Sequence, residues 1–148
     1  MSPQTIKFII TAVLILHGLA HGNATLALLR QAGGSTPILP VRSWLFRSLS
    51  SRTAAVIAGV FWLLSTVGFI AAALSFWGTL FAGIDWRQMA IVSAVISTAG
   101  IALFSGIWPG APSRRLSNLD TVIALVVNIA VFVALLWMHW PPYDMFGK

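Results

Sequence analysis

The stretch TAAVIAGVFWLLSTVGFIAAALSFW, residues 53–77, contains no charged residue and exceeds the ~20 apolar residues that an α-helix needs to cross a membrane. Three other apolar stretches, at about 6–30, 86–108 and 119–140, are also long enough. Helices satisfy their own backbone hydrogen bonds, as the lipid interior requires. We therefore predict an all-α integral membrane four-helix bundle that forms one transmembrane domain over residues 1–148.

The composition supports this class and excludes several functions. Hydrophobic residues make up 58% of the chain and charged residues 8%, whereas a soluble domain carries about 25% charged residues. Without cysteine there are no disulfides, thiolate metal sites or catalytic thiols. The three acidic residues, Asp85, Asp120 and Asp144, lie at the ends of spans or outside them, so no carboxylate pair serves acid–base catalysis. We predict no catalytic residue, no metal site and no nucleic-acid partner.

Basic residues are concentrated in the first and third connections between the spans. Neither connection contains an acid, whereas the second connection and the C-terminal tail each balance one acid against one base. By the positive-inside rule we expect connections one and three in the cytoplasm and both termini on the non-cytoplasmic side. The residues expected to contact lipid headgroups at the inner face are Arg42, Arg47, Arg52, Arg114 and Arg115.

Tryptophan positions agree with this orientation, because amphipathic rings favour the depth of the headgroups. Trp77, Trp86, Trp137 and Trp140 fall at the expected outer face, and Trp44 and Trp108 at the inner face. Trp62, inside the second span, is expected to be a packing or lipid-facing ring.

The first connection has a pattern of its own over residues 41–52. Apolar side chains at 41, 44, 45 and 49 recur at helical spacing against arginines and a serine. This pattern indicates a basic amphipathic segment that lies in the inner membrane interface. A docking surface for a partner subunit is the alternative interpretation.

Small residues indicate where the helices approach one another, since close van der Waals contact drives much of helix association in lipid. The third span has an unbroken row at every fourth position, so we expect it at a tight contact. The first span contains a Gly18-x-x-x-Gly22 motif, and such motifs are common in apolar spans. The residues of the row are Ala90, Ala94, Thr98, Ala102 and Gly106.

Two histidines, His17 and His21, lie inside the first span on one helical face. Measured from the expected span ends at Arg30 and Asp120, His21 and Asn128 both lie ~12–13 Å from the inner end. We expect a mid-membrane polar core of His21, Asn23, Asn128, Ser97 and Ser65.

This polar core has three interpretations: hydrogen bonds between helices, a small-molecule, quinone or lipid-headgroup site, and metal or haem ligation. The candidate ligand-binding residues are His17, His21, Asn23 and Asn128. His139 lies at the outer end of the fourth span, ~15 Å from the expected level of His17. A single haem cannot use both histidines as axial ligands within one chain, so haem would need a partner chain or other ligands.

Three short motifs resemble a group of small, uncharacterised bacterial four-span membrane proteins. The motifs are Leu16-His17-Gly18-Leu19-Ala20-His21, Phe61-Trp62-Leu63-Leu64 and Asn118 before the fourth span. The chain departs from the group after the second histidine, where Gly22-Asn23-Ala24 replaces its usual aromatic residues. The resemblance implies four helices and no established activity. We expect a multi-pass location in a bacterial inner membrane.

Abundant packing surface without catalytic residues favours a non-catalytic subunit or accessory protein of a larger membrane assembly. Two alternatives remain open: a carrier or binder that uses the polar core, and a protein associated with haem or pigment. The expected partners are the lipid bilayer and other membrane subunits or further copies of the chain. No cofactor is required by the sequence.

Overall fold

Four long helices form the protein, as the sequence predicts. The computed structural model describes residues 1–79, 83–104 and 108–146. Each helix is long and apolar enough to cross a membrane. The helices are α1 (Pro3–Ala32), α2 (Ser51–Phe76), α3 (Trp86–Leu103) and α4 (Arg114–Phe132). A π-helical turn, η1 (Val133–Trp137), continues α4, and a 3-10 turn, η2 (Tyr143–Phe146), follows it.

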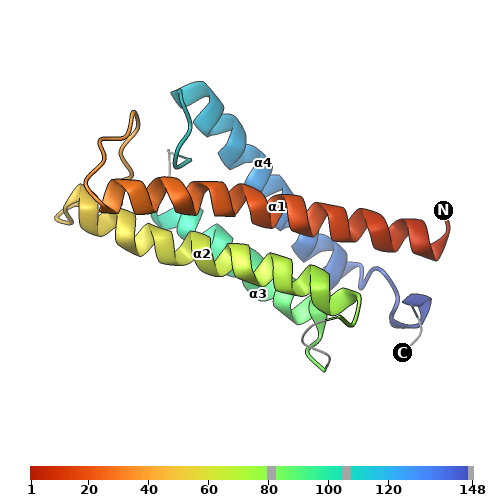
Figure 1. Ribbon diagram of the computed structural model, residues 1–148. Coiled ribbons are helices and arrows are strands. Elements are labelled where there is room, and N and C mark those ends of the chain that lie inside the picture. The colour runs from red at the N-terminus through yellow and green to blue at the C-terminus, as the bar shows by residue number, and fades with distance from the viewer. Residues whose placement is uncertain (80–82, 105–107, 147–148) are drawn as a thin grey trace.

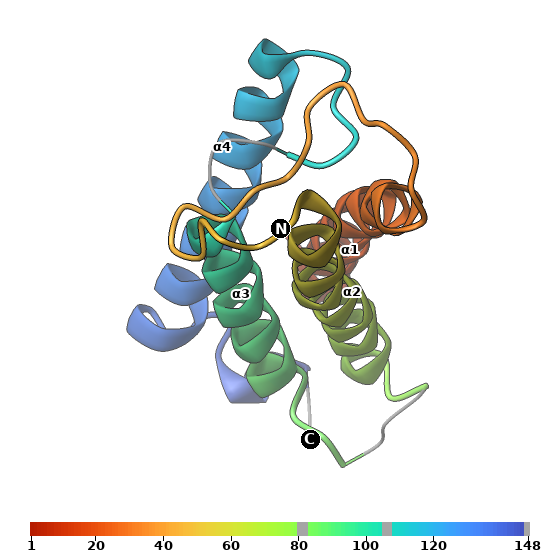
Figure 2. The ribbon, with the colours of Figure 1, turned by 90° about the vertical axis from the view of Figure 1, so that its left-hand side faces the viewer.

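The helices pack in chain order. Over the described residues, the close backbone contacts run from α1 to α2, from α2 to α3 and from α3 to α4. Because consecutive helices run in opposite directions, the N-terminus and the end of α4 lie at the same end of the molecule (Figure 1). Viewed at right angles, α3 lies between α2 and α4 (Figure 2). The first and last helices are therefore not joined side by side along their length.

Side-chain caps set the starts of the helices, and three starts lie earlier than the predicted ones. The Oγ atoms of Ser2, Ser50 and Ser113 accept backbone N–H bonds at the starts of α1, α2 and α4. The largest difference is at α4, which begins at Arg114 instead of residue 119. The prediction followed the apolar run, whereas the polar residues before it are already helical.

The close contact between α2 and α3 requires glycine, which has no side chain, at two positions. A Cβ atom added at Gly68 would lie 2.0 Å from Ser93 Oγ, and one added at Gly100 would lie 2.9 Å from Phe61 Cβ. Gly18 lies equally close to α2, where an added Cβ would meet Ile70 Cγ1 at 3.0 Å. The glycine motif of α1 therefore serves contact within the chain.

The predicted small-residue row of α3 is only partly buried. Ala90 and Ala94 are completely buried, and Thr98 is half-buried. Ala102 is exposed, so the buried part of the row ends before this residue. Gly106 lies outside the described residues. Ser93, Ser97 and Gly100, which flank the row, are buried as well, so α3 buries a wider face than a single row.

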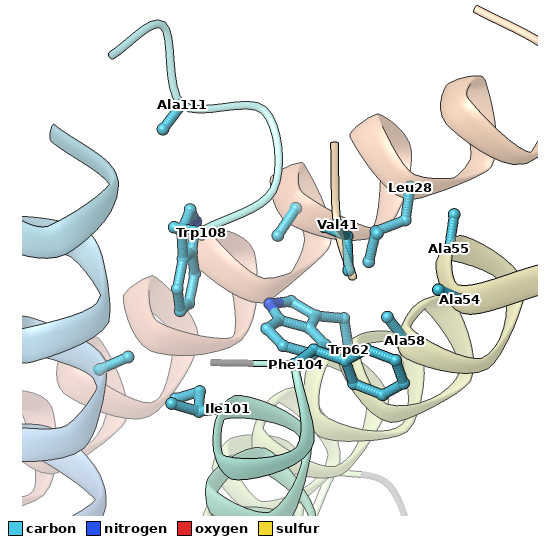
Figure 3. Close-up of a cluster of buried hydrophobic side chains, with 12 residues drawn as sticks. Leu28, Val41, Ala54, Ala55, Ala58, Trp62, Ile101, Phe104, Trp108 and Ala111 are labelled. Carbon is cyan, nitrogen blue, oxygen red and sulfur yellow. The ribbon is translucent and has the colours of Figure 1, made fainter. Parts of the chain in front are cut away.

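A cluster of aromatic and small side chains fills the end of the bundle near the first and third connections (Figure 3). Trp62 is 2% exposed and is thus a packing ring, one of the two roles expected for it. Trp108 is also buried, which corrects its predicted place at the headgroups. The helix α3 ends at Leu103, before the predicted residue 108, and the Trp108 backbone N–H donates to Ser117 Oγ of α4.

The first connection, residues 33–50, is not helical, so the helical spacing from residue 41 does not form a continuous amphipathic face. Val41 is buried, and its N–H donates to Gln31 Oε1 at 3.3 Å. Ser43 Oγ donates to the Leu103 carbonyl and Trp44 Nε1 to the Ala102 carbonyl. These carbonyls belong to the last turn of α3, which has no helical donors for them. Capping α3 thus explains the irregular path of the segment.

Candidate functional site

Two histidines of α1 meet an asparagine of α4 and a serine of α3 in a buried hydrogen-bond network. His17 Nε2 lies 3.1 Å from Asn128 Oδ1, and His21 Nε2 lies 3.0 Å from Ser97 Oγ. The Asn128 amide nitrogen donates to Ser97 Oγ at 2.8 Å and to Thr98 Oγ1 at 3.1 Å. The two histidine Nε2 atoms are 3.3 Å apart. The network therefore joins three helices at one point.

The partners fix the hydrogen positions on the two rings when each imidazole is neutral. Asn128 Oδ1 can only accept, so His17 Nε2 carries the hydrogen and His17 Nδ1 carries a lone pair. Because the hydrogen on His17 Nε2 leaves no room for another on His21 Nε2, 3.3 Å away, Ser97 Oγ accepts from Asn128 and donates its own hydrogen to His21 Nε2. His21 then carries its hydrogen on Nδ1. This nitrogen is buried and has no hydrogen-bond partner among the described residues.

Asn128 lies at the level of His17, whereas the sequence placed it level with His21. The difference follows from the observed helix ends. His17 lies fifteen residues from Ala32, or ~22 Å, and Asn128 lies fourteen residues from Arg114, or ~21 Å. His21 reaches Asn128 through Ser97. Both histidines thus belong to the polar core, with His17 as the direct partner.

Two other residues of the predicted core lie elsewhere. Ser65 is buried, but its Oγ donates to the Phe61 carbonyl of its own helix at 2.8 Å and does not join the network. Asn23 is exposed and faces a cavity instead of the interior of the bundle. Thr98, predicted as a packing residue, takes part in the network through Asn128.

This cavity, of about 310 Å³, lies between α1, α4 and the loop of residues 108–112. His17 and Asn23 contribute to the α1 side, and Asp120 contributes to the α4 side. The rest of the lining consists of Ala20, Trp108, Pro109, Gly110, Ala111, Pro112, Ile123 and Ala124. The cavity therefore adjoins the buried network, with His17 common to both.

The sequence also predicts that Asp120 caps the fourth helix and pairs with Arg114 and Arg115, because Ser117 and Asn118 beside it are typical of a helix start. The cap is instead Ser113, and Asp120 lies in the second turn of α4. Within the described part of the chain, its carboxylate has neither an ion-pair partner nor a hydrogen bond, and both arginines are exposed. The result is a half-buried, unpaired carboxylate on the wall of the cavity.

A second cavity, of about 260 Å³, lies toward the other end of the same two helices and is completely apolar. It is lined by α1 residues such as Ile9 and Val13 and by α4 residues such as Val127 and Ala130, with Trp86 and Trp140 at one end. The bond between His17 and Asn128 adjoins both cavities: His17 lines the polar cavity, and Asn128 lies on α4 between Val127 and Ala130, which line the apolar one. The helices thus meet at this bond and leave space on either side.

The remaining predicted residues are dispersed. Arg42, Arg47, Arg52, Arg114 and Arg115 are all exposed, which agrees with headgroup contact but does not test it. His139 is exposed after the π-helical turn, where its Nδ1 donates to the Trp137 carbonyl at 3.0 Å. Across residues 1–79, 83–104 and 108–146, no three histidine or acidic side chains are grouped as metal ligands.

Sequence reasoning missed two residues that shape the site and its surroundings. Asp120 was assigned to a helix start because Ser117 and Asn118 also resemble capping residues; its position beside a cavity depends on the crossing of α1 and α4. Arg87 entered the sequence analysis only as the base that balances the charge of Asp85 in the second connection. In the structure Arg87 is buried, and its guanidinium donates to the Pro141 carbonyl, which ties the C-terminal segment to α3. Neither tertiary contact has a local sequence signal.

The comparisons with known proteins add no relative: no family model, curated protein or solved structure matches the chain. The resemblance to small bacterial four-span proteins therefore stays an expectation from the short motifs.

Proposed function

We propose that the protein binds a small molecule within the membrane, in the cavity between α1, α4 and the 108–112 loop. The observation that carries this proposal is the meeting of His17, Asn23 and Asp120 around one cavity on helices long and apolar enough to span a bilayer. Ionisable groups are costly within membrane spans, and they are a common mark of ligand or ion sites. The proposal selects the binding alternative raised by the sequence.

The cavity has the general properties of a ligand site. Its volume of about 310 Å³ is at the lower end of the range for small-molecule sites, and a few polar groups interrupt a largely apolar lining. His17 is held in one orientation by Asn128, and Asn128 is held by Ser97 and Thr98. A polar group that is fixed before binding loses little freedom when a ligand arrives.

Filling the cavity tests the proposal. Ala20 is exposed and lines the cavity, so Ala20→Phe narrows it without entering the core. Leu19→Phe, at an exposed neighbouring position outside the lining, is the matched control. We expect native mass spectrometry of protein extracted from its own membranes to show one small molecule on the wild type and on Leu19→Phe. It should be lost from Ala20→Phe. Identical spectra for all three, or no bound molecule on any, would refute the proposal.

A second candidate function, a non-catalytic subunit of a larger membrane assembly, is supported by the apolar cavity. This space beside α1 and α4 has no polar lining and is suited to the side chains of another transmembrane helix. The test is purification in mild detergent under native conditions. A partner protein or a defined oligomer is expected, and a monomer without partners would count against this function. For either function we propose a multi-pass location in a bacterial inner membrane.

A further inference from the structure

We infer that the ligand of the polar cavity carries a cationic, hydrogen-bond-donating group, as an organic ammonium compound does. The inference rests on the proposed binding function and specifies its ligand class. Among the described residues that line the cavity, only Asp120 carries a formal charge. It has no ion-pair partner among the described residues, so its carboxylate can be neutralised by a ligand.

The other polar side chains of the cavity add hydrogen-bond acceptors. His17 donates from Nε2 to Asn128, so the ring nitrogen left for a ligand is Nδ1, which carries a lone pair. His17 is 6% exposed and cannot easily rotate to present its other nitrogen without breaking this bond. Asn23 has both an acceptor and donors on its exposed amide. Two of the three polar side chains thus favour a ligand that donates.

The loop of residues 108–112, on the third side of the cavity, offers few hydrogen-bond donors to a ligand. Pro109 and Pro112 have no backbone N–H. The N–H of Trp108 donates to Ser117 Oγ, and that of Ala111 donates to the Trp108 carbonyl at 3.3 Å. Among the five residues of this loop, only Gly110 has a backbone N–H without a hydrogen-bond partner among the described residues. An anion would need several such donors. The loop therefore does not form an anion-binding nest.

The remaining lining indicates the body of the ligand. Trp108, Ile123 and Ala124 offer apolar surface, and an indole face also attracts a cation. A small molecule with one ammonium group and a compact apolar body matches both parts. A carboxylate of the same shape would face Asp120 and the His17 lone pair, and would be repelled.

Three probes of nearly equal shape test the inference: 2-phenylethylamine, 2-phenylethanol and phenylacetate. Their binding to the full chain in nanodiscs of zwitterionic lipid is measured by calorimetry, with empty nanodiscs as the reference. We expect the amine to bind at least tenfold more tightly than the alcohol, and phenylacetate to bind most weakly. Asp120→Asn should abolish the preference for the amine. Asp144→Asn, at an exposed aspartate outside the cavity, should retain it.

The outcomes separate this inference from the proposed function. If the alcohol or phenylacetate binds the wild type as tightly as the amine does, the inference is wrong and the binding function stands. If sodium or potassium ions displace the amine at equal concentration, the site belongs to an inorganic cation and the inference is again wrong. If no probe binds, the inference fails, while the cavity-filling comparison at Ala20 still decides the function. Should Asp120→Asn not fold, the three probes on the wild type decide by themselves.

Discussion

At the scale of single residues, Asn128 connects more of the protein than any other polar side chain described above. Its amide accepts from His17 on α1 and donates to Ser97 and Thr98 on α3. It is completely buried, so removing it leaves its partners without water to replace the lost bonds. Its role is to hold α1, α3 and α4 at one crossing point.

We predict that Asn128→Ala lowers the free energy of unfolding by about 1–3 kcal/mol, since interhelical hydrogen bonds in membrane proteins average ~0.6 kcal/mol each and orphaned partners add to the loss. The measurement is denaturation by dodecyl sulfate in mixed micelles. Asn118→Ala is the control, because Asn118 is exposed on the same helix; it should change stability by less than ~0.5 kcal/mol. Equal losses in both variants would contradict the assignment.

Two buried serines allow a hydrogen bond between helices to be compared with one inside a single helix. Ser65 and Ser97 are both buried, but Ser65 bonds only within α2, whereas Ser97 links His21 to Asn128. We predict that Ser97→Ala costs about 1–2 kcal/mol and that Ser65→Ala is close to neutral. The same micelle denaturation measures both. A comparable loss for Ser65→Ala would show that Ser65 belongs to the polar core, as the sequence predicts.

The sequence allowed the members of this site to be predicted better than their pairing. Histidines and an asparagine within apolar spans are conspicuous, and their approximate depth can be counted along a helix. The pairing required helix ends accurate to a single turn. Capping by Ser113 starts α4 five residues before the apolar run. Asn128 therefore lies level with His17, whereas the predicted start placed it level with His21.

At the scale of helices, the contact between α2 and α3 leaves less space beside Gly68 than any other glycine of the described residues has. Ser93 occupies the space that a Cβ at Gly68 would need, with Oγ at 2.0 Å, and it is fixed by donation to the Met89 carbonyl at 2.6 Å. This pair brings the two helices together in the half of the bundle that contains the second connection. Hydropathy predicted the helices, but the sequence contained no signal that would pair this glycine with this serine.

We predict that Gly68→Ala destabilises the protein by about 1–3 kcal/mol, because the added methyl group forces the helices apart or displaces Ser93. Unfolding in mixed micelles is again the measurement. Gly22→Ala is the matched control: its Cβ would lie 3.5 Å from Thr66 Cγ2, an ordinary contact. Adding Ser93→Gly to Gly68→Ala should recover part of the loss. Because alanine favours a helix more than glycine does, an equal loss at Gly22 would show that the contact at Gly68 is not the cause.

The ends of the helices were the least predictable parts of these elements. The third span was predicted to reach residue 108, but α3 ends at Leu103, where Ser43 and Trp44 from the first connection bond its terminal carbonyls. A helix end that is capped by a distant loop leaves no pattern in its own sequence. The same contacts explain why the arginine-rich segment from residue 41 is not helical.

At the scale of the whole molecule, the order of packing explains where space is left. Each helix packs mainly against the next in the chain, so α1 and α4 do not lie side by side and meet at the hydrogen bond between His17 and Asn128. The cavities lie on either side of that meeting point. Hydropathy could predict four crossings, but not this open pair of helices, because it depends on crossing angles.

The orientation of the molecule remains a prediction, and the absence of cysteine makes it simple to test. Single cysteines at the exposed residues Gln4 and Thr79 mark the end of the molecule that contains the N-terminus and the second connection, and one at exposed Ser35 marks the first connection. If the arginine-rich connections are cytoplasmic, a membrane-impermeant maleimide should label Gln4→Cys and Thr79→Cys in intact cells. Ser35→Cys should be labelled only after permeabilisation.

The reverse pattern would place the polar cavity, which lies toward the end with the first and third connections, on the non-cytoplasmic side. An ammonium ligand would then enter from outside the cell.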